Sequence, residues 1–164
     1  MASVALITGA SGFLGYHFFN FLQKKSYKII NLYNQQSISF TNSTHIQCDI
    51  TKIENVLKLV QYSPKLIIHC AALTNIKHCE KNPSLAYEIN VTGSKNIAIL
   101  AKKIGAKLIY ISTDAVFHNT DTIYDELSIP DAQTIYGKTK YDGEKACQDI
   151  LPSTLVIRPS IFGI

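Results

Sequence analysis

Tyr136 and Lys140 are the residues whose types and spacing point most directly to chemistry. They lie four positions apart in Tyr136-Gly137-Lys138-Thr139-Lys140, so on a helix the phenol and the ammonium share one face. An ordinary tyrosine has a pKa of about 10, and a neighbouring cation lowers it toward the range useful for proton transfer. The pair is therefore typical of protonation of a carbonyl oxygen while a bound nicotinamide supplies hydride, with Lys140 also holding ribose hydroxyls. The alternative is a surface tyrosine packed on a lysine stem.

Thr113 is the hydroxyl that we expect beside this pair. It follows an apolar strand segment in Ile111-Ser112-Thr113-Asp114. Ligands of open α/β sheets lie beyond the carboxyl ends of the strands, where a hydroxyl can hydrogen-bond a reacting carbonyl. Ser112 is the alternative candidate for this hydroxyl. A purely structural interpretation is a Ser-Thr-Asp turn that caps the next loop.

A glycine-rich turn near the start of the chain predicts a phosphate-binding site. Gly9, Gly12 and Gly15 follow a G-x-x-G-x-x-G pattern between an apolar run and an amphipathic segment. Glycine permits a tight turn and a close backbone approach to a pyrophosphate, and the helix N-terminus offers free N–H groups to the anion. We therefore prefer dinucleotide binding to a merely structural turn. The predicted contacts are Gly9, Ser11, Gly12, Phe13, Leu14 and Gly15.

The end of the second strand bears on the choice between NAD and NADP. In the NAD pattern an acidic side chain there binds the ribose 2′-hydroxyl, but residues 31–35 read Asn-Leu-Tyr-Asn-Gln. Without a carboxylate to repel a 2′-phosphate, NADP (NADPH) is modestly preferred and NAD remains an acceptable cofactor. Asn31 is the predicted contact. Asp49 and Ile50, after the third strand, are placed to meet the adenine, although Asp49 could instead cap the following helix.

The elements that must position these residues alternate regularly between strand and helix. Short, mostly apolar runs alternate with longer amphipathic segments, which predicts an α/β fold: a doubly wound parallel sheet of about six strands in three layers, of the Rossmann type. The long irregular segment Asp114–Thr134 is expected to be functional. The predicted strands are Val4–Thr8, Lys28–Leu32, His45–Cys48, Leu66–Cys70, Leu108–Ser112 and Leu155–Arg158. The predicted helices are Phe13–Lys25, Ile53–Tyr62, Leu85–Ile104 and Ile135–Ile150.

Composition restricts the class of protein. The 164 residues, 46% apolar and 17% charged, fit a single domain over residues 1–164. A net charge of +4 with scattered lysine pairs gives no reason to expect a nucleic-acid partner. The four cysteines lack C-x-x-C spacing, so we expect reduced, mostly buried thiols and no metal site. No apolar run is long enough to span a membrane and no secretion signal is visible, so we expect a cytoplasmic protein without a membrane partner.

Taken together, these segments resemble an extended short-chain dehydrogenase/reductase, and within that superfamily the dTDP-4-dehydrorhamnose reductase family. The resemblance covers essentially the whole chain, and its most specific parts are Ser-Thr-Asp-x-Val-Phe and Tyr-Gly-x-Thr-Lys. The segments that carry it are Ile7–Gly15, His69–Thr74, Glu80–Asn90, Tyr110–Phe117 and Tyr136–Lys140.

This resemblance implies an NADPH-dependent reduction of a 4-keto nucleotide sugar, linked to dTDP or UDP, in dTDP-rhamnose biosynthesis or a similar pathway. It implies Thr113, Tyr136 and Lys140 as the catalytic triad. It also implies that Ala71, Ala72 and Thr74 lie along the cofactor and that Asn90 supports the site. In the family, the two long helices often pair subunits, so a homodimer is predicted.

The chain departs from the family pattern in two places. His118-Asn119 replaces the usual Asp-Gly after Phe117, so the loop that enters the substrate site is expected to differ in shape. The segment Ile157–Gly163 resembles the sixth strand and its nicotinamide contact, and the sequence ends one residue later. We therefore expect the C-terminal substrate subdomain of the family to be absent and turnover by this chain to be poor.

Two other functions fit the same residues. The first is a non-catalytic, NADP-binding regulatory subunit that resembles the methionine adenosyltransferase β subunit, which shares the Tyr-Gly-Lys-Thr-Lys segment and the Asp142–Lys145 run. The second is a nucleotide-sugar epimerase or dehydratase with tightly held NAD.

Overall fold

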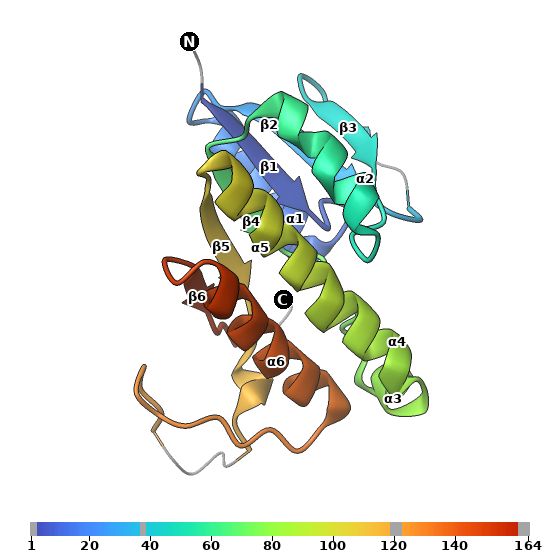
Figure 1. Cartoon of the computed structure of the whole chain (residues 1–164), viewed down its shortest axis with the longest axis vertical. Helices are drawn as coiled ribbons and strands as arrows, with labels where there is room; N and C mark the ends of the chain where they lie inside the picture. Colours follow the sequence, from blue (N-terminus) through green and yellow to red (C-terminus); the bar gives the residue numbers. More distant parts are fainter. Residues whose placement is uncertain (1–2, 37–38, 119–122, 161–164) are drawn as a thin grey trace.

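Six parallel strands form one sheet in the order β3-β2-β1-β4-β5-β6 (Figure 1). The computed structural model describes residues 3–36, 39–118 and 123–160. The strands are β1 (Val4–Thr8), β2 (Lys28–Tyr33), β3 (Thr44–Gln47), β4 (Leu66–His69), β5 (Lys107–Ile111) and β6 (Leu155–Ile157). The predicted doubly wound sheet is confirmed, and no strand end is shifted by more than one residue. The strand order reverses between β1 and β4, and ligands of such sheets bind in the crevice at this point.

The central strands are apolar throughout because both faces of the sheet are covered. Ala5, Leu6 and Ile7 of β1 are fully buried, although neighbouring residues of a strand point to opposite faces. Leu6 belongs to the core beneath one face, while Ala5 and Ile7 belong to the core beneath the other. The continuous apolar runs therefore reflect a sheet with a hydrophobic core on each side.

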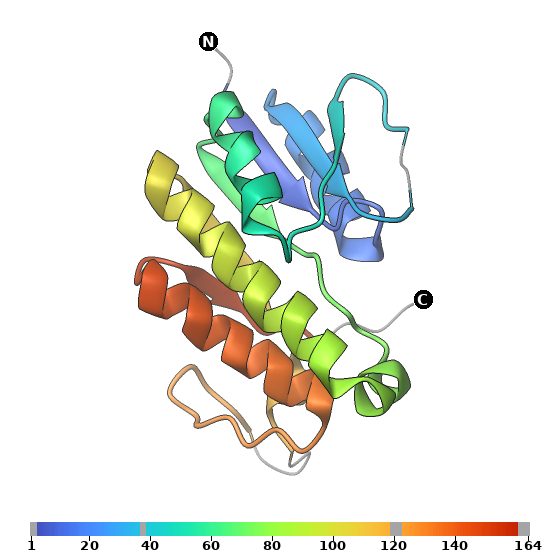
Figure 2. The same ribbon diagram turned by 45° about the vertical axis from the view of Figure 1, so that its right-hand side comes forward.

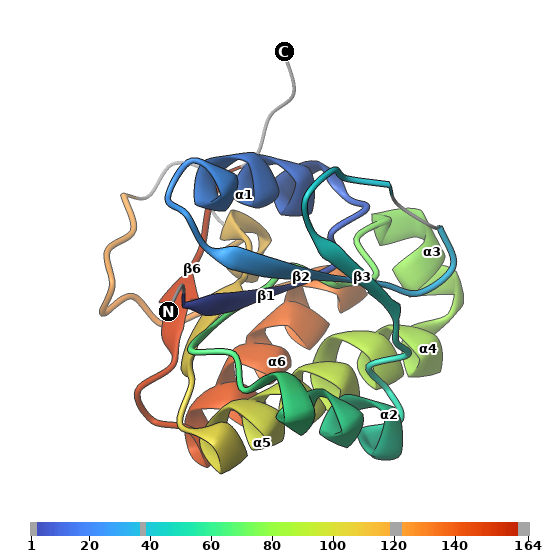
Figure 3. The ribbon, with the colours of Figure 1, turned by 90° about the horizontal axis from the view of Figure 1, so that it is seen from above.

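Helices on both faces complete the three layers (Figure 3). One face carries α1 (Phe13–Gln23), and the other carries α2 (Ile53–Leu57), α5 (Ser94–Ile104) and α6 (Ile135–Ile150). The helices α5 and α6 run side by side, as expected for the two long helices (Figure 2). Gly143 permits this close packing of α6, because a Cβ at this position would lie 2.5 Å from the carbonyl oxygen of Asn90.

Three predicted segments have more local structure than the hydrophobic pattern indicated. The helix Ile53–Tyr62 changes from α2 into the 3₁₀ helix η1 (Lys58–Tyr62). The helix Leu85–Ile104 is instead α4 (Pro83–Tyr87), a π-helical segment η2 (Glu88–Gly93) and α5, which ends at the left-handed Gly105. A short helix α3 (Ile76–Lys81), capped by the Asn75 side chain, precedes α4 and was not predicted. The long loop begins with a 3₁₀ turn, η3 (Asp114–Val116).

The described residues form neither a membrane-spanning helix nor a metal-binding cluster. Their helices are all too short or too polar to cross a membrane. No cluster of three or more His, Cys, Asp or Glu side chains in this part of the chain could hold a metal ion. The four cysteines are free, and three of them are buried.

Candidate active site

A cleft of about 1070 Å³ runs across the carboxyl ends of the central strands. It begins at the glycine turn after β1, passes the ends of β2 and β4, and reaches the loop after β5 and the start of α6. The predicted residues that line it are Gly9, Ser11, Gly12, Phe13, Leu14, Gly15, Asp49, Ile50, Ala71, Ala72, Thr74, Thr113 and Tyr136. The fold thus brings the phosphate-binding turn and two of the three predicted catalytic residues to one cavity.

The glycine turn has the geometry of a phosphate cradle. Gly9 has φ +64°, and a Cβ there would lie 2.7 Å from the backbone nitrogen of Ala71. A Cβ on Gly15 would overlap the Gly9 carbonyl, so α1 packs directly against the turn. Neither an acidic residue in the first turn nor a side-chain cap competes for the N-terminus of α1. This end of the cleft therefore fits an anionic group such as a pyrophosphate.

Asn31, the predicted second-strand contact, lies away from the cleft. Asn31 is fully buried within β2 and donates from Nδ2 to Ser43 Oγ at 3.1 Å, so it does not line the cleft. The strand continues to Tyr33, and the residues beyond its middle reach the cavity: Leu32, Tyr33, Asn34, Gln35 and Gln36. This wall has amide side chains but neither a carboxylate nor a cation, as the reasoning about the 2′-phosphate assumed.

Asp49 lines the cleft and does not cap the following helix. Its Oδ1 accepts hydrogen bonds from the Thr51 amide at 2.9 Å and from Thr51 Oγ1 at 2.8 Å, which closes a local turn. The N-cap position of α2 belongs to Lys52, which has no side-chain capping bond. The alternative of a helix cap was wrong because the chain needs three more residues to turn from β3 into α2.

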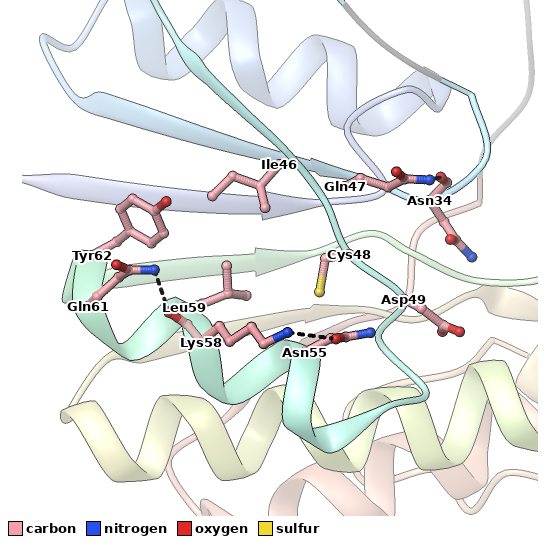
Figure 4. A pocket seen from close by; sticks show the side chains of 10 residues that line it. All are labelled: Asn34, Ile46, Gln47, Cys48, Asp49, Asn55, Lys58, Leu59, Gln61 and Tyr62. Carbon is pink, nitrogen blue, oxygen red and sulfur yellow. Dashed lines mark hydrogen bonds between the residues drawn. The ribbon is translucent and has the colours of Figure 1, made fainter.

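A smaller cavity of about 430 Å³ lies beside the cleft, between β3 and the α2–η1 segment (Figure 4). It shares Asn34, Cys48 and Asp49 with the cleft. The Lys58 ammonium extends along this cavity to within 3.5 Å of Asn55 Oδ1. No predicted function depends on this cavity.

A buried hydrogen-bond chain connects the glycine turn to the π-helical segment η2. The Ala71 amide donates to Thr8 Oγ1 at 3.0 Å, and Thr8 Oγ1 lies 2.6 Å from His69 Nδ1. His69 Nε2 lies 2.9 Å from Ser94 Oγ, which donates to the Asn90 carbonyl at 2.6 Å. Because the first amide must donate and the last carbonyl must accept, Nδ1 is the acceptor and Nε2 the donor of a neutral imidazole. Burial, together with the charge of Lys140, lowers the pKa of His69 to about 3.

Asn90 acts from behind the cleft wall and does not line the cavity. Its Oδ1 accepts from the Leu73 amide at 2.7 Å, and its Nδ2 donates to the Leu73 carbonyl at 3.1 Å and to Thr139 Oγ1 at 3.0 Å. The side chain therefore ties the segment after β4 to α6. This arrangement fits the supporting role implied by the resemblance, and the direct cofactor contact stays a prediction.

Thr113 and Tyr136, two of the predicted catalytic residues, both line the cleft. Thr113 Oγ1 accepts from the Ala115 amide at 3.1 Å and donates to Asp114 Oδ1 at 3.1 Å. Two oxygen acceptors hold the start of α6, since Glu80 Oε1 accepts from the Ile135 amide and Thr134 Oγ1 from the Gly137 amide. Burial raises the pKa of Tyr136, and its interaction with Thr113 opposes that shift.

Lys140 lies under the floor of the cleft. Its side chain is buried, its Nζ donates to the Ile111 carbonyl at 2.7 Å, and the ammonium lies 4.2 Å from the centre of the Tyr110 ring. Burial lowers the pKa of Lys140 to about 8. The expected lowering of the Tyr136 pKa by Lys140 is absent from this arrangement, because the ammonium is engaged with β5 and the interaction that lowers it comes from Thr113.

Sequence reasoning missed three groups of residues around the site. The cleft wall formed by Ile76 and His78 of α3, Leu85 of α4 and Glu88 of η2 was not predicted, although Asn75 and Pro83 are recognisable helix-start signals. The chain through Thr8, His69 and Ser94 connects residues too far apart in sequence to suggest a pattern. The ion pair between Glu144 and Arg158 was missed for the same reason, because no local pattern connects the two residues.

The loop after η3 is anchored at both ends of its described part. The His118 amide donates to Asp131 Oδ1 at 2.8 Å, and the Asp131 amide donates to the Val116 carbonyl at 3.0 Å. Asn119, the second residue of the departure from Asp-Gly, lies outside the described residues, as does the part of the predicted nicotinamide-contact segment from Ile161 to Gly163. Pro159 of that segment lines the cleft.

Comparisons with known proteins agree with this geometry. The family model described as the RmlD substrate binding domain matches residues 3–163. A probable low-salt glycan biosynthesis reductase, Agl14 of Haloferax volcanii, is 35% identical over 97% of this chain and 54% of its own length. Methionine adenosyltransferase 2 subunit beta of Xenopus laevis is 38% identical over 97% of this chain and 47% of its own.

A solved structure of a dTDP-4-dehydrorhamnose reductase has the same fold over nearly the whole chain. The dTDP-4-dehydrorhamnose reductase of Bacillus anthracis in complex with NADP superposes with a TM-score of 0.84 at 37% identity, covering 98% of this chain and 54% of that one. The present chain thus spans about half the length of the relatives it matches.

Proposed function

The chain belongs to the RmlD substrate binding domain family, and from this premise we propose that it serves the NADPH-dependent reduction of a 4-keto nucleotide sugar. The observation that carries the proposal is a single cleft with a glycine cradle at one end and Thr113 and Tyr136 at the other. The cradle fits a pyrophosphate, and the cleft volume of about 1070 Å³ leaves room for a dinucleotide. The NADP complex of the Bacillus anthracis reductase supports the same choice of cofactor.

The chain's own residues divide the work of the reaction. A bound NADPH supplies the hydride for the carbonyl carbon. Tyr136 donates its phenolic proton to the carbonyl oxygen, so that the carbonyl becomes an alcohol. Thr113 holds this oxygen by a hydrogen bond. Lys140 keeps a positive charge beneath the site at pH values below about 8, while its Nζ donates to the Ile111 carbonyl.

Cofactor titration and one conservative variant test this proposal. Calorimetric titration of the chain with NADPH and NADH should show binding of both, with NADPH the tighter. Tyr136→Phe should keep its NADPH affinity but lower the reduction of dTDP- or UDP-linked 4-keto sugars by about 10²-fold or more, because it lacks the acidic hydroxyl. Tyr141→Phe, on the same helix but outside the cleft, is the matched control. Absence of dinucleotide binding, or full activity of Tyr136→Phe, would contradict the proposal.

The rate of the wild-type chain is itself informative. We expect poor turnover from these 164 residues, because remote contacts to the nucleotide normally position the reacting carbon. Robust turnover would show that no further substrate subdomain is needed.

A regulatory subunit is the second candidate function. Its support is the 38% identity to methionine adenosyltransferase 2 subunit beta over nearly the whole chain. Such a protein would bind NADP and a protein partner and leave the keto sugar unreduced. Stable co-purification of an adenosyltransferase, together with the absence of turnover, would favour this function. A nucleotide-sugar epimerase or dehydratase, the remaining prediction, would instead retain NAD through purification.

We also propose a homodimer formed through the outer faces of α5 and α6. These helices lie side by side on one face of the sheet, which leaves a broad surface for a second copy (Figure 2). Light scattering at high concentration tests this, and a clean monomer would contradict it.

We place the protein in the cytoplasm, where nucleotide sugars and NADPH are available.

A further inference from the structure

An ion pair between a buried carboxylate and a partly exposed guanidinium joins α6 to the residue that directly follows β6. The Glu144 carboxylate on α6 is 1% exposed, and Arg158 contacts it through Nη2–Oε2 at 2.7 Å and through Nε to Oε1 and Oε2 at 3.0 and 3.2 Å. Neither residue lines the cleft. An ion pair with a buried carboxylate adds little net stability over well-packed apolar side chains. Stability alone therefore does not explain why these two residues are paired here.

The pair also holds the residue next to Thr113. Ser112 Oγ donates a hydrogen bond to Glu144 Oε1. The backbone reinforces the same contact, because the Ser112 amide donates to the Ile157 carbonyl at 2.7 Å and the Asp114 amide to the Pro159 carbonyl at 3.2 Å. The chain on both sides of Thr113 is therefore fixed to the end of β6, and its serine is fixed to α6.

The arginine extends this arrangement to the loop between the two catalytic candidates. The Arg158 guanidinium lies 5.2 Å from the centre of the Phe117 ring, which stacks on the Tyr124 ring at 4.0 Å. Phe117 directly follows η3, the turn that begins at Thr113. A displaced Arg158 would thus release the start of the loop as well as the carboxylate.

The same helix presents the reacting tyrosine. Tyr136, Lys140 and Glu144 are spaced by four residues and so share one stripe of α6. This stripe carries the proton donor at one end and the anchor for Thr113 at the other. A shift of Glu144 relative to Ser112 would therefore change the separation between Thr113 and Tyr136.

We propose that Glu144 and Arg158 are positioning residues, which hold Thr113 at the correct place relative to Tyr136 through Ser112. Neither residue contacts substrate or cofactor. The catalytic consequence of this positioning rests on the proposed reductase function. The placement of Thr113 beside Tyr136 can be measured without turnover.

Ser112→Ala is the sharpest test, because it cuts the link to Thr113 and leaves the ion pair in place. The ionisation of Tyr136 is followed by NMR with ¹³C-labelled tyrosine and assigned with Tyr136→Phe. The interaction with Thr113 lowers the pKa of Tyr136, so Ser112→Ala should measurably raise that pKa. Ser112→Thr restores a hydroxyl and should restore the wild-type titration. Ser43→Ala, which removes a hydrogen-bonding hydroxyl beside β3 and away from the cleft, is the matched control.

Kinetics give the second measurement wherever the chain reduces a keto sugar. Ser112→Ala and Arg158→Met should lower kcat by about ten-fold or more, with NADPH affinity changed less than about two-fold. Lys145→Met removes an exposed ion pair with Asp142 on the same helix and should change neither value.

Two results separate the proposals. If Ser112→Ala leaves the Tyr136 titration and kcat unchanged while Arg158→Met lowers only the unfolding temperature, the ion pair is merely structural and the positioning role is refuted. If the wild type reduces no 4-keto sugar but Ser112→Ala still raises the Tyr136 pKa, the positioning of Tyr136 is supported and the reductase function fails.

Discussion

His69 should make the protein sensitive to mild acid. Its imidazole is buried between Thr8 and Ser94, where Nδ1 accepts from the Thr8 hydroxyl and Nε2 donates to Ser94 Oγ. Protonation would turn Nδ1 into a donor facing a hydroxyl that already accepts from the Ala71 amide. The Thr8 hydrogen would then lose its partner inside the core.

The size of the effect follows from the pKa of about 3 in the folded protein against about 6.5 in the unfolded chain. The folded-state value is the lower one, so the unfolded chain takes up the proton first, and stability falls as the pH falls from about 6.5 toward 3. The slope in this window is about 1.4 kcal/mol per pH unit, which gives a loss of about 2 kcal/mol between pH 7 and pH 5. This is a large part of a typical folding free energy of about 5–15 kcal/mol.

Urea unfolding at pH 7, 6 and 5 measures this loss for the wild type and for His69→Gln. The variant is expected to be less stable at pH 7, because an amide cannot reproduce the ring geometry, but its free energy of unfolding should change with pH by about 2 kcal/mol less than that of the wild type. His17→Gln, which removes an exposed histidine on α1, should keep the wild-type slope. Equal pH slopes for wild type and His69→Gln would refute the reasoning.

Two further substitutions probe the ends of the cleft. Asn34→Asp places a carboxylate on the amide-lined wall and should weaken NADPH binding by about ten-fold or more through repulsion of the 2′-phosphate, while NADH is unaffected or improved. Calorimetry measures both, with Asn55→Asp in the neighbouring cavity as the control, and equal changes for the two cofactors would count against the assignment. Gly137→Ala would drive a Cβ into the Ala115 carbonyl and should cost more than about 2 kcal/mol by urea unfolding. Gly105→Ala, with open space around it but φ +66°, should cost only about 1 kcal/mol, and equal costs would contradict the steric argument.

The sequence predicted the parts of the site that depend on local pattern. The glycine turn, the Thr113 position and the face shared by Tyr136 and Lys140 follow from strand ends and helical spacing, and the structure brings these elements together. Asn31 was predicted as a contact near the end of the second strand, but β2 continues to Tyr33 and the Asn31 side chain is buried beside Ser43. Pattern alone cannot show where a strand stops.

The parts that could not be predicted depend on contacts between distant segments. Lys140 was expected to face Tyr136, but the Ile111 carbonyl and the Tyr110 ring hold its ammonium below the floor. The two partners of the Glu144–Arg158 pair lie on different elements, and only the three-dimensional packing of α6 on β6 brings them together. A single sequence contains no periodicity that reports such contacts.

The π-helical segment η2 changes how the long helix between residues 83 and 104 should be compared and engineered. A wider turn accommodates one extra residue, so the positions before and after it follow two different helical phases. Removing one residue from this turn would let an uninterrupted α-helix form, but it would rotate everything on one side by about 100° relative to the other. Asn90 would then point away from Leu73 and Thr139 even though the helix itself had become more regular. In this protein a local gain in helical regularity would disconnect the cleft wall from α6, so an alignment gap of one residue at this point predicts a different site.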